Sequence, residues 1–249
     1  ASDVYKRQLS NSDKTDGFLK KTRSIVRNDF GGAFFQAGVS ELTMACMCIG
    51  MYLHGGVIPA CGTFFVFSDY MKPAVRMAAL MEVPIKFIWT HDAFRVGEDG
   101  PTHEPVEQEA QIRLMEKLKN HHGKDSVRVF RPADADETTV CWAMAMENMD
   151  TPTALIFSRQ NITKLPAGTD YEQARKGAYI VAGSDDDFDV ILLADGSEVS
   201  TLVAGAELLR KDGIKIRIVS APSEGLFRSQ SKEYQESILP TGSKIFGMT

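Results

Sequence analysis

The sequence lacks any apolar run long enough to cross a membrane, since a spanning helix needs roughly 20 consecutive apolar residues. No apolar stretch follows the basic residues near the start of the chain, so the sequence predicts no secretory signal either. We therefore expect a soluble cytoplasmic protein.

The chain also lacks an excess of positive charge. It has 28 Lys and Arg against 33 Asp and Glu, a formal net charge of -5. A nucleic-acid-binding surface depends on a basic field, which this balance does not supply. Nucleic acid is therefore excluded as a partner, and recognition of any anionic group must be local.

Cysteine is scarce and is not spaced for metal binding. The four cysteines are Cys46, Cys48, Cys61 and Cys141. None form a C-x-x-C pair, so we expect buried reduced thiols. A zinc site recruiting His91 and His103 fits none of the usual ligand spacings, and Gly97 to Gly100 lacks the alternating oxygen ligands of a calcium loop. No metal ligands are expected in this chain.

Apolar residues make up 43% of the 249 residues, enough to fill one large core or two ordinary ones. Hydrophobic periodicity predicts helices over 41–53, 63–81, about 105–118 and 136–149, with strands over 84–90, 127–130 and 153–157. Strands that alternate with helices favour a parallel sheet covered on both faces. The sequence therefore predicts an α/β fold.

The alternating pattern stops between about 161 and 176, where we expect an interdomain linker. A second unit follows, with a strand over 190–194, a helix over 197–211 and a strand over 214–220, which form a right-handed βαβ unit. Asp185 to Asp187 are read as a solvated turn before it. This gives one domain over 1–165 and a partial α/β domain over 176–249, with too few elements to close.

The segment from Thr90 to Gln108, THDAFRVGEDGPTHEPVEQ, is the most informative part of the chain. It gathers two histidines and several acids after an expected strand, where open α/β sheets place their ligands.

Two other features of the sequence have ordinary structural explanations. Glu41, after the expected helix N-cap Ser40, is favourably placed at a helix start without any function. Aromatic residues at every third position of a helix share one face and ordinarily fill a core.

The residues GEDGPTH, Gly97 to His103, resemble a loop of the transketolases, thiamine-diphosphate enzymes that move a two-carbon ketol unit between sugar phosphates in the pentose phosphate pathway. The resemblance runs from about Leu9 to the end of the chain. It implies a thiamine-diphosphate-binding pyrimidine domain followed by the beginning of a C-terminal domain. The family's amino-terminal domain, which grips the diphosphate and Mg²⁺, is not matched, and Asp195-Gly196-Ser197 does not reproduce its Gly-Asp-Gly motif.

The resemblance implies roles for the residues that match the family's cofactor site. Glu41 matches the catalytic glutamate that hydrogen-bonds N1′ of the aminopyrimidine. Phe64, Phe67 and Tyr70 match the aromatic residues around that ring, and stacking on a flat heterocycle suits them.

The resemblance also implies substrate contacts. His91 would hold the sugar phosphate, Asp99 would accept a hydrogen bond from a substrate hydroxyl, and His103 would contact the ketol region near the thiazolium. Arg159 matches a phosphate-binding arginine, whose planar fork binds phosphate oxygens in pairs. Ser12 is the match to a phosphate-binding serine.

These matches favour a transketolase piece that is inactive alone and completes its site with the amino-terminal domain of a second subunit, as a homodimer when complete. The alternatives are a β-type subunit of a 2-oxo acid dehydrogenase or a deoxyxylulose-phosphate synthase, and a non-catalytic subunit that keeps the fold to bind a partner. Ala1 to Gln8 look foreign to the family pattern, so either a truncated or a naturally split enzyme fits the sequence.

Overall fold

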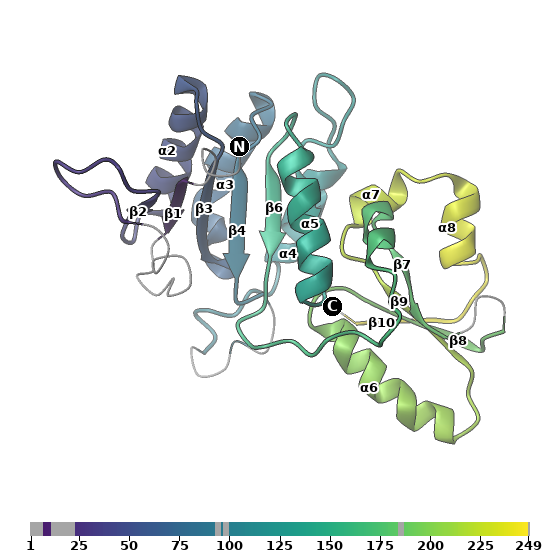
Figure 1. Cartoon of the computed structure of the whole chain (residues 1–249). Helices are drawn as coiled ribbons and strands as arrows, with labels where there is room; N and C mark the ends of the chain where they lie inside the picture. The colour runs from purple at the N-terminus through teal and green to yellow at the C-terminus, as the bar shows by residue number, and fades with distance from the viewer. Residues whose placement is uncertain (1–6, 11–22, 93–95, 97–99, 184–186, 249) are drawn as a thin grey trace. The chain divides into compact units, whose positions relative to one another are not determined.

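The computed structural model describes residues 7–10, 23–92, 96, 100–183 and 187–248 (Figure 1). The chain divides into two compact units. The first comprises Ala1–Arg128 with Asn148–Leu155, and the second comprises Val129–Glu147 with Ile156–Thr249. Each unit is described by itself. Among the described residues, no helix is both long enough and apolar enough to cross a membrane.

A parallel sheet forms the centre of the first unit. Its strands are β1 (Arg7–Ser10), β2 (Phe34–Gln36), β3 (Pro59–Phe64), β4 (Lys86–Thr90) and most of β6 (Thr153–Ile156), in the spatial order β2-β1-β3-β4-β6. Strand β5 (Arg128–Phe130) falls mostly in the second unit. The pairs β1–β2, β1–β3 and β3–β4 are parallel. The helices that follow in the chain are α2 (Glu41–His54), α3 (Ser68–Leu80) and α4 (Gln108–Lys117). The predicted α/β fold with a parallel sheet flanked by helices is confirmed.

The helix predicted over 63–81 is wrong in its first part. Strand β3 continues to Phe64, a 3₁₀ turn, η1, spans Phe65–Phe67, and α3 begins only at Ser68. The aromatic residues recur every third position, which imitates a helical period. The strand prevails because β3 hydrogen-bonds to β1 on one side and β4 on the other. Its small residues give little β-propensity, so the sequence pattern did not reveal it.

Helix α2 begins and ends where the sequence predicts, but its start is not capped as expected. Ser40 occupies the N-cap position without a side-chain capping bond. Its hydroxyl donates instead to the Ala37 carbonyl at 2.9 Å. Gly55 ends the helix with φ of 96°, a conformation that glycine adopts without steric cost.

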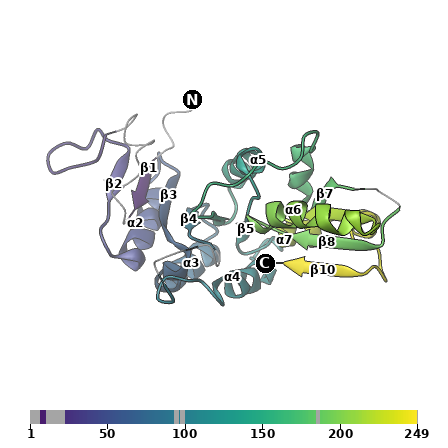
Figure 2. The same ribbon diagram turned by 90° about the horizontal axis from the view of Figure 1, so that it is seen from below.

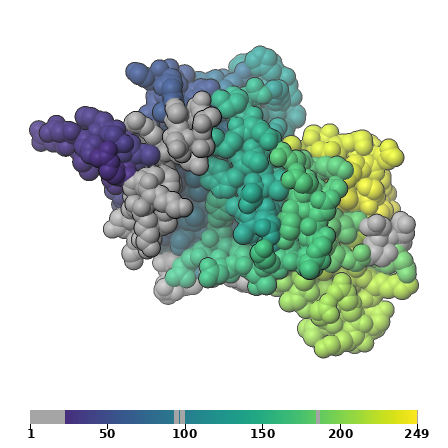
Figure 3. Space-filling model, viewed as in Figure 1, coloured from purple at the N-terminus to yellow at the C-terminus, as the bar shows by residue number. Residues whose placement is uncertain are grey.

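The second unit contains a four-stranded sheet in the order β10-β8-β9-β7. Its strands are β7 (Tyr179–Ala182), β8 (Val190–Ala194), β9 (Ile216–Ser220) and β10 (Ile245–Met248). Its helices are α5 (Ala135–Glu147), α6 (Glu198–Lys211), α7 (Glu224–Arg228) and α8 (Lys232–Ile238). Figure 2 shows β8 beside β10, its parallel partner, and α6 is drawn in light green at the surface in Figure 3.

The predicted strand–helix–strand unit is present as β8, α6 and β9, with the two strands parallel. Strand β7 pairs with β9 in the antiparallel direction, so this sheet is mixed. The sequence pattern did not predict β7, β10, α7 or α8. These elements are short, and Ile245 and Phe246 of β10 are exposed, so the sequence gives no clear periodic pattern for them.

Part of the segment expected as a linker, 161–176, hydrogen-bonds to the start of α5. Leu165 is buried, and its backbone N–H donates to Asp134 Oδ2 at 2.9 Å. The hydroxyl of Tyr171 donates to the same oxygen at 2.8 Å. A second 3₁₀ turn, η3, spans Tyr171–Lys176. The prolines and glycines of this segment remove regular periodicity, but they do not prevent it from hydrogen-bonding to the start of α5.

Buried charges hold the second unit together. Arg131 is 1% exposed and forms ion pairs with Asp195 at 2.5 Å and with Glu198 at 2.6 Å. Glu137 of α5 is fully buried and accepts hydrogen bonds from Tyr179 Oη at 2.9 Å and Ser220 Oγ at 2.8 Å. Buried polar groups are tolerated only when they are paired, so these contacts fix α5 against β7 and β9.

All four cysteines are free. Cys48, Cys61 and Cys141 are buried as predicted, whereas Cys46 is exposed. Cys46 lies on the outer face of α2, where the apolar composition of the helix misled the prediction.

We predict that Glu137 makes the second unit less stable as pH rises. Burial raises the pKa of its carboxyl group from 4.5 to about 7. The folded state therefore binds a proton more tightly than the unfolded state between these values, and the free energy of unfolding falls over that window, by on the order of 3 kcal/mol. Urea unfolding between about pH 5 and pH 8 measures this slope, with Trp142 of α5 as the reporter in a Trp89→Phe background.

Glu137→Gln cannot ionise and should flatten the slope. Glu207→Gln, at an exposed ion-paired glutamate of the same unit, is the matched control and should keep the wild-type slope. Parallel pH profiles for the wild type and Glu137→Gln would contradict the prediction.

Candidate functional site

The candidate site lies at the carboxyl ends of β3 and β4. These strands are parallel neighbours, and their last residues, Phe64 and Thr90, are paired in register. The segments that leave the two strands, η1 and the loop that begins with His91, therefore start side by side. The carboxyl edge of a parallel sheet is the usual position for ligands in this class of fold.

Five aromatic and imidazole rings gather at this edge, and we call them the aromatic cluster: Phe64, Phe67, Tyr70, His91 and His103. The ring centroids of Phe64 and His91 are 3.6 Å apart in a stacked arrangement. Phe67 lies 6.2 Å from Phe64 and meets His103 edge to face at 5.2 Å. The structure thus brings together five of the predicted site residues, although a single helical face does not carry them.

Tyr70 extends the aromatic cluster toward solvent. Its ring lies 6.2 Å from that of Phe67, and the residue is 63% exposed. A large aromatic residue at this exposure has a face available for another molecule.

Each histidine of the aromatic cluster is oriented by the threonine before it. Thr90 Oγ1 and His91 Nδ1 share a hydrogen bond of 2.9 Å, and Thr102 Oγ1 and His103 Nδ1 share one of 2.8 Å. With Nδ1 engaged, Nε2 is the ring nitrogen of His103 that we expect to meet a ligand. The sequence reasoning missed both threonines, although the repeated Thr-His pair within one segment is a visible signal.

The backbone of His91 is strained. Its φ is 62°, in the left-handed region that non-glycine residues rarely occupy. The stack on Phe64 and the bond to Thr90 hold the imidazole in place despite this cost. Strain of this kind is common where a side chain must be aimed at a ligand.

Glu41 is the first residue of α2 and is 8% exposed. Because α2 follows β2 in a parallel sheet, its first turn lies toward the carboxyl edge of that sheet, which is also the edge of the aromatic cluster. The buried residues that follow, Met44 and Ala45, are apolar. A buried carboxyl group at this edge of the sheet suits proton transfer to a bound ligand.

Arg159 belongs to the second unit, where it is exposed after β6. Its neighbours Ser158 and Gln160 line a groove together with Pro132, Ala135 and Thr138 around the start of α5. Two further predicted residues, Ser12 and Asp99, lie outside the described residues.

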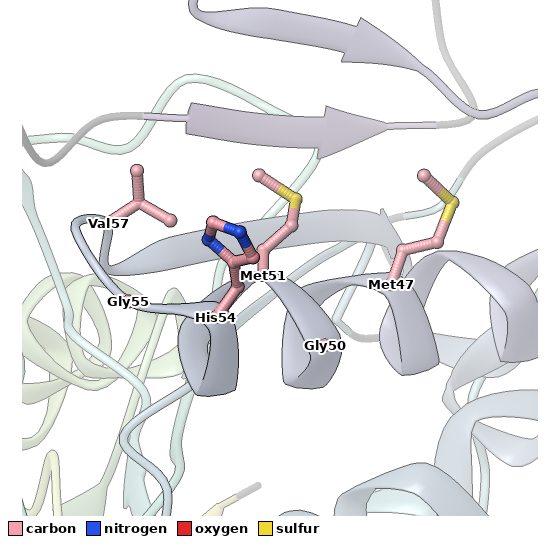
Figure 4. Close-up of a pocket in the computed structure, with 6 residues that line it drawn as sticks. All are labelled: Met47, Gly50, Met51, His54, Gly55 and Val57. Carbon is pink, nitrogen blue, oxygen red and sulfur yellow. The ribbon is translucent and has the colours of Figure 1, made fainter.

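A separate apolar groove lies at the other end of α2, lined by Met47, Gly50, Met51, His54, Gly55 and Val57. Figure 4 shows the side chains of Met47, Met51 and His54 rising from the same side of the helix. At 1.5 Å per residue, His54 is roughly 20 Å along the helix from Glu41. The groove is therefore distinct from the aromatic cluster.

No group of three or more His, Cys, Asp or Glu side chains is placed to hold a metal ion, within the part of the chain that the structure describes. What the site offers is a set of flat rings, two oriented imidazoles and a buried carboxyl group. These groups are suited to binding a flat heterocycle and to moving protons, and they provide no metal centre of their own.

Two models of known protein families match the chain, one in each of two consecutive segments. Residues 8–164 match the family model described as transketolase, pyrimidine binding domain. Residues 177–249 match the model described as transketolase-like TK C-terminal domain.

Individual relatives agree with these models. A transketolase of Halalkalibacterium halodurans is 46% identical over 235 residues, which cover 94% of this chain and 34% of that protein. The structure is similar to transketolase from Leishmania mexicana, with a TM-score of 0.86, 35% identity and coverage of 97% of this chain and 35% of that one. It is also similar to Pichia stipitis transketolase in complex with sedoheptulose 7-phosphate, with a TM-score of 0.85, 36% identity and coverage of 96% and 35%. The chain thus spans about a third of the length of these relatives.

The strained backbone at residue 91 leads to a prediction about stability. His91→Gly and His91→Ala both lose the stack on Phe64, but only glycine relieves the left-handed backbone. We expect His91→Gly to be the more stable of the two by about 1 kcal/mol in urea unfolding.

His54, in the last turn of α2, is the matched control. Glycine is the poorer residue in a helix, so His54→Gly should be less stable than His54→Ala. The prediction is wrong if alanine is favoured over glycine at both positions.

Proposed function

The chain belongs to the transketolase family, and we propose that it supplies the pyrimidine-binding half of a thiamine-diphosphate site that transfers a two-carbon ketol unit between ketose and aldose phosphates. The observation that carries this proposal is the aromatic cluster, in which two threonine-oriented histidines meet stacked rings at the carboxyl edge of β3 and β4. Because the chain spans about a third of its relatives, the activity is proposed for an enzyme that this chain completes.

The residues present fit thiamine diphosphate in part. Flat rings at an edge with exposed Tyr70 suit stacking on an aminopyrimidine, at roughly 0.5–1.5 kcal/mol per contact beyond area burial. We assign Phe64, Phe67 and Tyr70 to this contact. The Mg²⁺ and diphosphate ligands are proposed to lie in the amino-terminal domain of the family, as the resemblance implies. When bound, thiamine diphosphate would supply the carbon nucleophile that carries the ketol unit.

Glu41 is the proposed proton-holding group. Its carboxyl group would hold a proton at N1′ of the aminopyrimidine, and its burial would limit the access of water to that proton. His103, whose Nδ1 is engaged by Thr102, would present Nε2 to the ketol oxygen atoms of the substrate.

We assign the sugar phosphate to the remaining matched residues. His91 and Arg159 would bind the phosphate group, Ser12 would add a hydroxyl, and Asp99 would accept a hydrogen bond from a substrate hydroxyl. Support comes from the family, including the Pichia stipitis transketolase that binds sedoheptulose 7-phosphate. A guanidinium fork and an imidazole donor are chemically suited to a phosphate dianion.

The proposed partner is the amino-terminal, diphosphate-binding domain of a second subunit, in a homodimer. Exposed apolar side chains on α2 and α3 support an interface: Leu42, Met47, Leu53, Met77 and Leu80. Surfaces with several such residues are typical of protein contacts.

We further propose a domain boundary between 165 and 176. The completed enzyme is proposed to act in the cytoplasm, in the pentose phosphate pathway.

In an enzyme completed with the amino-terminal domain, Glu41→Gln should lower turnover by several orders of magnitude. The change is nearly isosteric but removes the proton-holding group. Hydrogen–deuterium exchange at C2 of the bound thiazolium measures the affected step directly.

Glu207→Gln, an exposed glutamate of the second unit, is the control and should leave the exchange rate unchanged. An unchanged exchange rate in Glu41→Gln would instead return Glu41 to a purely structural position at the helix start.

Arg159→Ala should raise the Michaelis constant for phosphorylated donors in the completed enzyme by about 10- to 100-fold, since a charge-assisted hydrogen bond contributes roughly 1.5–3 kcal/mol. An unphosphorylated donor such as hydroxypyruvate has no such contact to lose. Steady-state kinetics with xylulose 5-phosphate and with hydroxypyruvate, using one unphosphorylated acceptor, separates the two cases.

Arg210→Ala is the matched control, because Arg210 is an ion-paired surface arginine on α6. It should leave both Michaelis constants unchanged. Equal losses with both donors in Arg159→Ala would mean that Arg159 supports the fold and does not recognise phosphate.

A further inference from the structure

Gln108 is the first residue of α4 and is only 3% exposed. Its Nε2 donates to Asp69 Oδ2 at 3.0 Å, and its Oε1 accepts from the Val106 backbone N–H at 2.8 Å. Asp69 lies in the first turn of α3, 39 residues away in sequence. One buried amide therefore bridges α3 and the end of the segment that carries His103.

Both ends of this bridge lie close to rings of the aromatic cluster. Asp69 directly precedes Tyr70 and lies two residues after Phe67, and Val106 lies three residues after His103. The rings of Phe67 and His103 meet edge to face at 5.2 Å. The backbone N–H of His103 donates to the Gly100 carbonyl. This bond lies within one turn, so it does not set the distance between that turn and α3. The Gln108 bridge is placed to set that separation.

The chemistry of the bridge requires an amide. The Asp69 carboxylate needs a donor and the Val106 N–H needs an acceptor, and a carboxamide offers both on one rigid end group. Asp69 also forms an ion pair with Lys72, three residues further along α3. Only Gln108 of this bridge is buried, so a side chain at 108 that cannot make both bonds leaves its own polar atoms without partners and frees α3 from the Val106 segment.

We propose that Gln108 is a positioning residue that holds the imidazole of His103 against the ring of Phe67. The role of that imidazole toward substrate rests on the proposed function, but its placement is a property of the chain alone. A residue that supported only α4 would change stability and leave the surroundings of the His103 ring as they are.

The test uses the 249-residue chain with labelled histidine, which gives five imidazole spin systems. The ring current of Phe67 should move the chemical shifts of the His103 ring protons away from the values of a solvent-exposed histidine. The signals that disappear in His103→Asn are those of His103. Gln108→Glu keeps the acceptor for Val106 but sets a second carboxylate against Asp69. We expect it to abolish at least half of the His103 displacement while the His91 signals, shifted by Phe64, stay in place.

Rescue separates positioning from general loss of stability. Adding Asp69→Asn to Gln108→Glu reverses the polarity of the bridge, because the new amide at 69 donates to the new carboxylate at 108. The displacement of the His103 signals should return. Gln111→Glu, the same change three residues further along α4 at a half-buried position, is the matched control and should leave these signals in place.

If Gln108→Glu does not fold, Gln108→Met replaces it in the test. Methionine has a similar volume but makes neither hydrogen bond, so at least half of the His103 displacement should again be lost. An unchanged His103 displacement, an equal loss in Gln111→Glu, or no recovery in the double variant would each overturn the proposal. These spectra contain no cofactor or substrate, so their outcome is independent of the Glu41→Gln test: either proposal can fail while the other stands.

Discussion

The parallel pairing of β3 with β4 is the constraint on which the site depends. Its register ends with Phe64 opposite Thr90, so the two segments that carry the rings leave the sheet at neighbouring points. Strand β4 is also fixed at its other end, where the buried Lys86 Nζ donates to the Asn148 carbonyl at 2.7 Å. Burial lowers the pKa of Lys86 to about 7. A shift of the register by one residue would reverse the face of every side chain on the strand and separate the rings.

Both units have an apolar core. In the first, Phe65, Phe87 and Trp89 stack beside the parallel sheet. In the second, Ile191, Val219 and Ile238 form an apolar cluster, and Arg131 and Glu137 add buried polar contacts that tie α5 and the segment before it to the C-terminal sheet. Paired buried charges give little net stability, but breaking one pair is costly, so they specify how these elements must fit together.

The site itself combines rigid and adaptable parts. The rings of Phe64 and His91 are fixed by a strand end, a stack and a strained backbone, whereas Tyr70 is largely exposed. His103 depends on contacts made across the sequence, by the ring of Phe67 and, as we propose, by Gln108. The site therefore joins two rings held by the sheet edge to two whose positions depend on contacts outside it.

The sequence by itself determined the α/β class, most of the longer helices and strands, and the family, because hydrophobic periodicity and the GEDGPTH motif are local properties of the chain. It also identified the members of the aromatic cluster through family resemblance. The sequence did not reveal β3, whose small residues form a strand only between β1 and β4, or the anchoring of 161–176 by Asp134. Only the tertiary structure decided that Phe64 stacks on His91, that Thr90 and Thr102 orient the two histidines, and that Gln108 reaches Asp69. The contacts of Phe64 with His91 and of Gln108 with Asp69 join residues far apart in the chain. Their geometry is set by the pairing of strands and by packing, which local sequence patterns do not encode.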